Sequence, residues 1–339
     1  MQNTSSPARQ FEFLIQRLLQ VNGFDVTRFD DPRGIGGFDF SGKYAEENWA
    51  IEVKYYRTAR AQASLIESAA ARLVYRAVTA QAWRGMLIVS SVVPSSLRIA
   101  LEQKYDLTIV DRPDLLAWAA AEPSLVDEIT ALLELEPTET SQGHAPNLKA
   151  SVRITGSAPP VDTRGTDLCR RLKELPRGKT TWKKYEELCA EILRYLFPND
   201  LLGWHTQKRT DDGLNRFDFV CRIRPTTEFW NFLIDHLDSR YVLFEFKNYN
   251  SQIKQGQILT TEKYLLEKGL RRAAIILTRI GAEKEAVRMT QGAMRENGKL
   301  MLVVNDDKVC EMLHMKERGE DPTDCLFELA DDFLLSLPR

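Results

Sequence analysis

Apolar residues recur along the first third of the chain with the spacing of a helix and then with that of strands, in alternation. In 10–21 they follow the i, i+3, i+4 spacing of one helix face, and Gly23 is a typical residue to end such a helix. Short apolar runs bounded by Gly, Pro and Asp predict strands. The predicted helices are 10–21, 58–79, 94–104 and 112–121, and the predicted strands are 23–29, 38–40, 49–56, 85–91 and 107–110. This order predicts an α/β fold in which helices flank a central mixed sheet.

The same order of elements begins again after residue 180. The predicted helices are 182–197, 228–237, 255–268, 283–296 and one beginning at 308, and the predicted strands are 217–223, 240–249, 272–278 and 300–305. Residues 134–166 are rich in Pro, Thr, Ser and Gly and lack sustained periodicity, apart from one short strand predicted at 151–156. We therefore predict an N-terminal domain at 1–133, a linker at 134–179 and a C-terminal domain at 180–339.

Two charged residues interrupt the apolar strand WAIEVKYY at 49–56. Glu52 and Lys54 are two positions apart, so both side chains point to the same face of the strand, and Asp39 in the preceding strand lies within reach of that face. Buried charges are unfavourable unless they are paired or functional. An isolated Glu-x-Lys is also typical of an edge strand whose charges discourage aggregation.

A second copy of this pattern favours a function. The strand RYVLFEFKNY at 240–249 holds Glu245 and Lys247, each 193 residues after its counterpart, and Asp218 lies upstream in NRFDF. Two carboxylates and a lysine that converge on one face can hold a hard divalent cation with a water molecule beside it. The sequence therefore indicates an internal repeat of one α/β unit with the same charged group in each copy.

With these residues in place, each half resembles the PD-(D/E)xK nuclease superfamily, and the N-terminal half is most similar to Mrr-type restriction endonuclease domains. In the first half the resemblance rests on Phe11-Glu12, Gly36-Gly37-Phe38-Asp39, Glu52-Val53-Lys54, 87–91 and 107–116. In the second half it rests on Tyr185-Glu186, Asp218, Glu245-Phe246-Lys247, 275–278 and 302–313. The second half departs from the family pattern in two ways. It has 26 residues between its aspartate and its Glu-x-Lys, against 12 in the first half, and no Gly-Gly precedes the aspartate.

The resemblance implies two tandem restriction-endonuclease-like domains that hydrolyse phosphodiesters with Mg²⁺, or with Mn²⁺ in its place. The implied metal ligands are Asp39 and Glu52 in the first copy, and Asp218 and Glu245 in the second. Lys54 and Lys247 are implied to orient the attacking water or to lower its pKa. The accessory positions are Glu12, Glu186, Gln62, Gln255 and Gln257, of which the last two are alternatives for one glutamine. A glutamate near a helix N-terminus is equally well explained by the helix dipole.

Composition and charge add few constraints. A hydrophobic share of 43% and a charged share of 28% are typical of globular proteins. The net charge of −2 does not indicate a nucleic-acid-binding protein, but 170–184 is strongly basic with one acidic residue, and Arg57, Arg60, Arg72 and Arg76 follow the first motif. A local basic face is sufficient to bind phosphates, and a solvated helix face is the alternative.

The cysteines and the chain ends favour a cytoplasmic protein. The five cysteines are far apart and form no Cys-x-x-Cys, and the four histidines are scattered, so we expect free buried thiols and neither a zinc site nor a Ser/His/Asp triad. We expect no membrane contact, because no apolar run reaches about 18 residues and 1–13 lacks the apolar core of a secretory signal.

The resemblance to PD-(D/E)xK nucleases implies a Mg²⁺-dependent endonuclease that acts on DNA in restriction or anti-phage defence. The alternative is a nucleic-acid-binding or scaffold subunit of a defence complex in which one or both domains do not cut. No sequence resembles a Walker A loop, so this chain is not expected to drive translocation with ATP. The sequence leaves several points open: one or two active sites, DNA or RNA, single or double strands, homo-oligomerisation, and a partner protein for recognition or triggering.

Overall fold

The chain folds into two compact units, each built around one sheet. The computed structural model describes residues 6–28, 38–80, 84–134, 143–149, 151–206 and 218–338. The first unit comprises residues 1–162 together with Arg318–Glu320, and the second comprises Thr163–Glu317 and Asp321–Arg339. Among the described residues, none of the helices combines the length and the apolar character that crossing a bilayer requires.

The elements of the first unit follow the predicted order. They are α1 (Pro7–Val21), β1 (Asp25–Arg28), β2 (Phe40–Tyr44), β3 (Glu47–Lys54), α2 (Ala63–Thr79), β4 (Arg84–Val89), α3 (Ser95–Tyr105), β5 (Leu107–Val110), α4 (Arg112–Ala119) and α5 (Pro123–Leu133). Helix α1 starts where expected for its sequence, because Ser6 accepts a hydrogen bond from the Arg9 amide and Pro7 occupies the first helical position.

The second unit repeats this series with two added α-helices and two short 3₁₀ turns. Its elements are α6 (Arg164–Glu174), the short 3₁₀ turn η2 (Lys179–Thr181), α7 (Trp182–Leu196), β6 (Leu201–Thr206), β7 (Phe219–Ile223), α8 (Glu228–Asp235), β8 (Tyr241–Lys247), α9 (Gln255–Glu262), η3 (Glu267–Gly269), β9 (Ala273–Thr278), α10 (Lys284–Asn297), β10 (Leu300–Asn305), α11 (Asp306–Glu317) and α12 (Thr323–Leu335). The added α-helices are α6, in the range predicted as a linker, and α8, inserted before the motif strand.

Both sheets have the same topology. The orders are β1-β2-β3-β4-β5 and β6-β7-β8-β9-β10. In each sheet the first three strands pair antiparallel, and the motif strand and the two after it pair parallel. The register also repeats, since Glu52 lies opposite Leu87 and Glu245 opposite Ile276. The predicted α/β class with a mixed sheet is confirmed for both halves.

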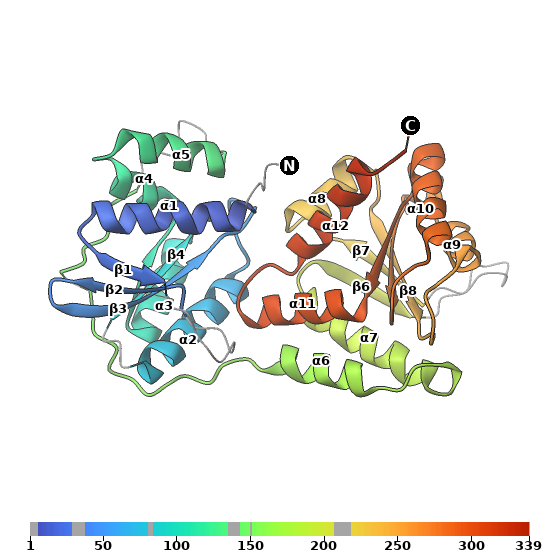
Figure 1. Cartoon of the computed structure of the whole chain (residues 1–339), viewed down its shortest axis with the longest axis horizontal. Coiled ribbons are helices and arrows are strands. Elements are labelled where there is room, and N and C mark those ends of the chain that lie inside the picture. Colours follow the sequence, from blue (N-terminus) through green and yellow to red (C-terminus); the bar gives the residue numbers. More distant parts are fainter. Residues whose placement is uncertain are drawn as a thin grey trace. The chain divides into compact units, whose positions relative to one another are not determined.

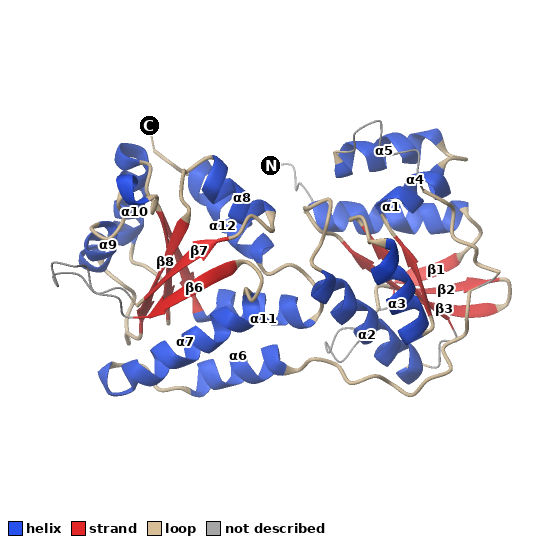
Figure 2. Cartoon of the chain, turned by 180° about the vertical axis from the view of Figure 1, so that it is seen from behind, coloured by secondary structure: helices blue, strands red, loops and turns tan. Residues whose placement is uncertain are grey.

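In each unit, helices cover both faces of the sheet (Figure 1). In the first unit, α1, α4 and α5 pack on the face that carries Ile51 and Val53, whereas α2 and α3 pack on the face that carries Ala50. In the second, α7, α8, α11 and α12 cover the face of Phe244 and Phe246, and α9 and α10 cover the other. Figure 2 shows the strands of each sheet enclosed by these helices. By alternation, Glu52 and Glu245 extend toward the α2 and α9 sides.

Several elements differ from the predictions. Helices α5 and α12 and strand β6 were not recognised in the sequence, and residues 151–156, predicted to hold a strand, are irregular. The helix predicted at 255–268 ends at Glu262. Short segments such as these owe their conformation to the surface on which they pack, because periodicity over so few residues is a weak signal.

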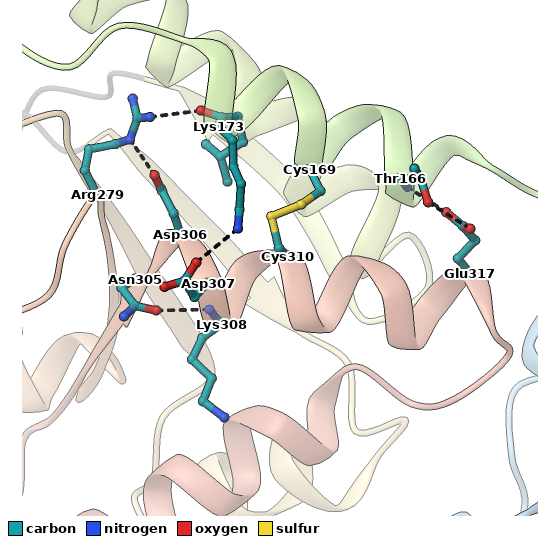
Figure 3. The surroundings of a disulfide bond; sticks show 11 residues. Thr166, Cys169, Lys173, Arg279, Asn305, Asp306, Asp307, Lys308, Cys310 and Glu317 are labelled. Atoms are coloured by element: carbon teal, nitrogen blue, oxygen red, sulfur yellow. Dashed lines mark hydrogen bonds and ion pairs between the residues drawn. A yellow bond between two sulfur atoms is a disulfide. The ribbon is translucent and has the colours of Figure 1, made fainter. Parts of the chain in front are cut away.

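The expectation of free thiols is wrong for one pair of cysteines. Cys169 on α6 and Cys310 on α11 form a disulfide with their Cα atoms 5.1 Å apart (Figure 3). A separation of 141 residues hid this pair, because only the packing of α6 on α11 brings the two side chains together. Cys189, Cys221 and Cys325 are buried free thiols, as expected.

Candidate active site

An aspartate in the first unit binds the motif strand just before β2 begins. β2 pairs with β3 only as far as Phe40 opposite Ile51. The next amide on that edge of β3, the N–H of Val53, donates instead to Oδ2 of Asp39 at 2.7 Å. This hydrogen bond to a side chain takes the place of a backbone hydrogen bond between β2 and β3. It holds the Asp39 carboxylate beside the strand segment that carries Glu52 and Lys54.

The second unit repeats this arrangement. β7 pairs with β8 as far as Phe219 opposite Phe244, and the amide of Phe246 donates to Oδ2 of Asp218 at 2.8 Å. The longer insertion before β8 therefore leaves the position of the aspartate unchanged. The structure brings together the Asp, Glu and Lys predicted from the sequence in both units.

Glu52 and Lys54 form a buried ion pair. Their side chains meet at 2.5 Å, and the residues are only 5% and 6% exposed. A third carboxylate lies near the ammonium group, since Oε1 of Glu320 is 3.5 Å from Nζ of Lys54 within the first unit. Arg318 in turn donates to both carboxylate oxygens of Glu320, at 2.9 and 2.8 Å.

Burial dominates the electrostatics of this group. It raises the pKa of Glu52 to about 8, with Lys54 opposing the rise and Asp39 adding to it. Burial likewise raises the pKa of Asp39, while Lys54 and the Val53 amide act to lower it. Although burial alone would lower the pKa of Lys54, the carboxylates of Glu52, Glu320 and Asp39 raise it above the ordinary value.

The raised pKa of Glu52 predicts a stability that falls with rising pH in the metal-free protein. Because the folded-state pKa lies above the ordinary 4.5, the folded protein binds one more proton than the unfolded chain between about pH 4.5 and 8. The contribution of Glu52 to the free energy of unfolding has its full value below pH 4.5 and is lost as the pH rises through 8. Each pKa unit corresponds to about 1.4 kcal/mol, so the loss of unfolding free energy from pH 5 to 8.5 is expected to exceed about 1 kcal/mol.

This dependence is tested by urea unfolding at both pH values in EDTA. Glu52→Gln carries no titrating proton and is expected to show a correspondingly smaller pH effect. Glu46→Gln is the matched control, because Glu46 is exposed and, among the described residues, pairs only with Lys43 across a surface contact of 2.9 Å. Equal pH effects in the wild type and Glu52→Gln would contradict the assignment.

The second unit holds a similar pair. Nζ of Lys247 donates to Oε2 of Glu245 at 2.7 Å, and Glu245 is 4% exposed. Burial raises the pKa of Glu245 to about 7, again opposed by Lys247 and reinforced by Asp218. Burial alone would lower the pKa of Lys247, but Glu245 holds it above the ordinary value.

One carboxylate oxygen in each pair is available to a further ligand. Oε2 of Glu52 and Oε1 of Glu245 are buried, and neither has a hydrogen-bond partner in the described structure. A buried carboxylate oxygen without a partner is costly unless a cation or water molecule meets it. Oxygen donors from an Asp-Glu pair suit Mg²⁺, which keeps several of its own waters. Within the described residues, no group of three or more Asp, Glu, His or Cys side chains is arranged to hold a metal, so each site offers a pair.

Two accessory glutamates lie on corresponding helices. Glu12 on α1 is half-buried and pairs with Arg28. Burial raises the pKa of Glu12, followed by the effect of Asp39, and Lys54 acts to lower it, so Glu12 is electrostatically coupled to the site. Glu186 is half-buried at the equivalent position on α7.

The glutamines fit the prediction less well. Gln62 precedes the first residue of α2, and its main-chain carbonyl accepts the first amide bonds of that helix. Oε1 of Gln257 accepts from the Lys254 amide at 2.9 Å, so this side chain caps α9. Gln255, at the start of α9, is exposed. The structure thus gives Gln257 a local role and leaves an active-site role for the three glutamines as a prediction.

Sequence reasoning missed two neighbours of the sites. Glu320 lies far from the first motif in sequence, and its short segment resembles no functional pattern. Tyr264, after α9, is coupled to the second site, since burial followed by Glu245 raises the pKa of Tyr264. Only the folded chain brings these side chains to the motif strands.

The Mrr-type family model, described as "Restriction endonuclease", matches residues 4–119. The N-terminal domain is restriction-endonuclease-like. The match spans α1 through α4, including Asp39, Glu52 and Lys54, and confirms the predicted resemblance for this half of the chain. It does not extend to the second unit, where the resemblance stays a prediction.

Other comparisons add little to the restriction-endonuclease-like assignment. No curated protein matches the chain. A solved structure titled "Protein of Unknown Function AF1548" is similar over 54% of this chain and 87% of its own, with 13% identity and a TM-score of 0.26. A likeness at that level supports no argument about fold or function.

Proposed function

We propose that the protein is a Mg²⁺-dependent endonuclease that hydrolyses phosphodiester bonds of DNA. The observation that carries this proposal is the repeated group of a strand-bound aspartate, a buried glutamate with one unpartnered oxygen, and a lysine bound to that glutamate. The restriction-endonuclease-like match over residues 4–119 supports it for the first unit. We propose the two predicted domains, 1–133 and 180–339, as two nuclease domains joined by the region 134–179.

In this proposal the carboxylates of each unit hold the metal ion. Asp39 and Glu52 would bind it in the first site, and Asp218 and Glu245 in the second. The bound ion would neutralise charge that develops on the scissile phosphate. Lys54 and Lys247 would orient the attacking water with their ammonium groups, which the neighbouring carboxylates keep protonated. Glu12 and Glu186 would accept hydrogen bonds from water at the edge of each site.

A further candidate function follows from the limited extent of the family match. Because the match ends at residue 119, the second unit is the better candidate for a domain that grips nucleic acid without cutting it. In that case the protein is a binding or scaffold subunit with one active domain or none. We also propose that the protein acts in restriction or anti-phage defence. A partner protein would trigger it, and it would form homo-oligomers. We propose the cytoplasm as its location, although disulfides are rare there.

Metal-dependent cleavage is the direct test of this function. Supercoiled plasmid, single-stranded DNA and RNA are incubated with the purified protein in Mg²⁺, Mn²⁺ or EDTA. We expect DNA to be cut with either metal and left intact in EDTA. Intact DNA under all conditions, with DNA affinity retained in EDTA, would favour the binding subunit. Preferential cutting of RNA would replace the proposed substrate.

A further inference from the structure

The basic stretch between α6 and α7 divides into two parts in the structure. The three basic residues of 170–184 that lie on α6 are engaged by carboxylates. Arg170 pairs with Asp167 and Glu174, Arg171 with Glu191, and Lys173 with Asp307. These charges are compensated locally, as the solvated-face alternative requires.

The basic residues that follow are different. Arg177, Lys179, Lys183 and Lys184 are exposed, and none of them forms an ion pair in the part of the chain that the structure describes. Trp182 stands among them with 45% of its surface exposed. We call Arg177, Lys179, Trp182, Lys183 and Lys184 the connector patch, because they lie in the connection from α6 into α7. No acidic residue interrupts 175–184, so the patch carries four positive charges and no negative charge of its own.

The backbone beneath the connector patch is held in place. The side-chain amide of Asn248 donates to the carbonyl of Gly178 and to Oγ1 of Thr181, both at 3.0 Å, and the Gly178 amide donates back to the Asn248 carbonyl at 2.9 Å. Gly178 has a φ of 109°, a backbone conformation that residues with a Cβ rarely adopt. Arg279 donates to the carbonyl of Leu175 at 3.0 Å. The basic side chains therefore project from a fixed connection and from the first turn of α7 that follows it.

These hydrogen bonds also place the connector patch at the end of β8, the strand that carries the second candidate site. Asn248 directly follows Lys247, at the end of β8. Figure 1 shows α6 and α7 side by side with this connection at their end, and Figure 3 shows Arg279 reaching toward α6. A nucleic-acid strand that runs past the end of β8 would meet both the patch and the Glu245–Lys247 pair.

We propose that the connector patch binds the sugar-phosphate backbone of single-stranded nucleic acid, with Trp182 stacked on an unpaired base, and guides the strand to the second site. Four exposed cations on this connection and the first turn of α7 suit successive phosphates, and the exposed indole of Trp182 among them suits stacking on a base. The guiding role rests on the proposed nuclease function. Binding of a single strand by the connector patch requires no cleavage.

A neighbouring hollow does not fit the same ligand. A cavity of about 540 Å³ between α6 and α7 shares Lys184 with the connector patch. Glu174, Glu187 and Glu191 also line it, and these carboxylates would repel a phosphate. We therefore place the backbone on the exposed patch and not in the cavity.

The test is equilibrium binding in EDTA, so that nothing is cut. A fluorescent single-stranded oligonucleotide and its duplex are titrated at several salt concentrations. We expect a variant with Arg177, Lys179, Lys183 and Lys184 all changed to Gln to bind the single strand at least about tenfold more weakly. Its slope of log affinity against log salt is expected to be shallower by about 3, since each phosphate contact to a single strand contributes about 0.7. Trp182→Ala is expected to weaken single-strand binding about tenfold and duplex binding far less.

The control variant changes four paired basic residues of the same unit, Arg170, Lys173, Arg295 and Lys308, to Gln. It alters the net charge by the same amount and is expected to bind nearly as the wild type does. Single-strand binding by the patch variant equal to that of the wild type or the control would overturn the proposal. Equal losses on single strand and duplex for Trp182→Ala would overturn the stacking role. Binding of poly-L-glutamate as tight as that of the oligonucleotide would instead assign the patch to an acidic protein.

Failure of this proposal differs from failure of the proposed function. If the wild type binds single strands through the connector patch but never cuts, the surface stands and the nuclease proposal fails. If the wild type cuts, while the patch variant binds and cuts as the wild type does, the nuclease proposal stands and the connector patch has no role.

Discussion

Replacing Lys54 and Lys247 together with Met is expected to reduce plasmid nicking by about 10² to 10⁴-fold in Mg²⁺. Each lysine forms an ion pair with a buried glutamate and, in the proposed mechanism, orients the attacking water. Methionine keeps the apolar part of the side chain and removes the ammonium group. The measurement is the initial rate of conversion of supercoiled to nicked plasmid, with the fold checked by circular dichroism.

The single variants separate the two sites. Lys54→Met alone is expected to remove the larger part of the activity, because the family match covers the first unit. Lys43→Met is the matched control, since Lys43 is exposed and its one ion pair within the described residues is with Glu46 at the surface. Nicking by the double variant at the wild-type rate would contradict the nuclease proposal. A rate unchanged by Lys247→Met would assign the second unit to binding.

The second large effect concerns stability, and its source is Arg279. This buried guanidinium donates to Asp306 at 2.7 Å, to Asn248 at 2.9 Å, and to the carbonyls of Leu172 and Leu175. Arg279→Met leaves these acceptors without their donor in a buried region. The expected loss is about 3–5 kcal/mol of unfolding free energy for the second unit.

Urea unfolding followed by circular dichroism measures this loss. Arg295→Met is the control, because Arg295 is exposed and, in the part of the chain that the structure describes, pairs only with Glu296. It is expected to change stability by less than about 0.5 kcal/mol. Adding Asp306→Asn to Arg279→Met is expected to recover part of the loss, since the unpaired buried carboxylate is then absent. A loss below about 1 kcal/mol for Arg279→Met would show that water replaces the guanidinium at little cost.

The candidate site was predictable because its central geometry is local. Alternation along a strand suffices to put Glu52 and Lys54 on one face, and a second copy made a functional explanation more convincing than an edge strand. The upstream aspartate was predictable only as a residue within reach. Its bond to the Val53 amide depends on where β2 stops pairing with β3, which no local pattern encodes.

Residues that belong to the sites through distant contacts were not predictable. Glu320 approaches Lys54 from a segment more than 260 residues away in sequence, and Tyr264 reaches the second site from beyond α9. The basic stretch 170–184 looked uniform in sequence. Only the structure divides it, because Glu191 and Asp307 pair with Arg171 and Lys173 of α6, whereas the exposed basic residues that follow form no ion pair among the described residues.

The sequence by itself determined the repeated α/β architecture, the two Glu-x-Lys strands and the division into two halves, because hydrophobic periodicity and side-chain alternation are properties of neighbouring residues. The tertiary structure decided the anchoring of Asp39 and Asp218, the burial that raises the pKa values of Glu52 and Glu245, the Cys169–Cys310 disulfide and the exposure of the connector patch. Each of these depends on which distant segments pack together, and that packing sets the burial and the charge partners on which the proposed chemistry depends.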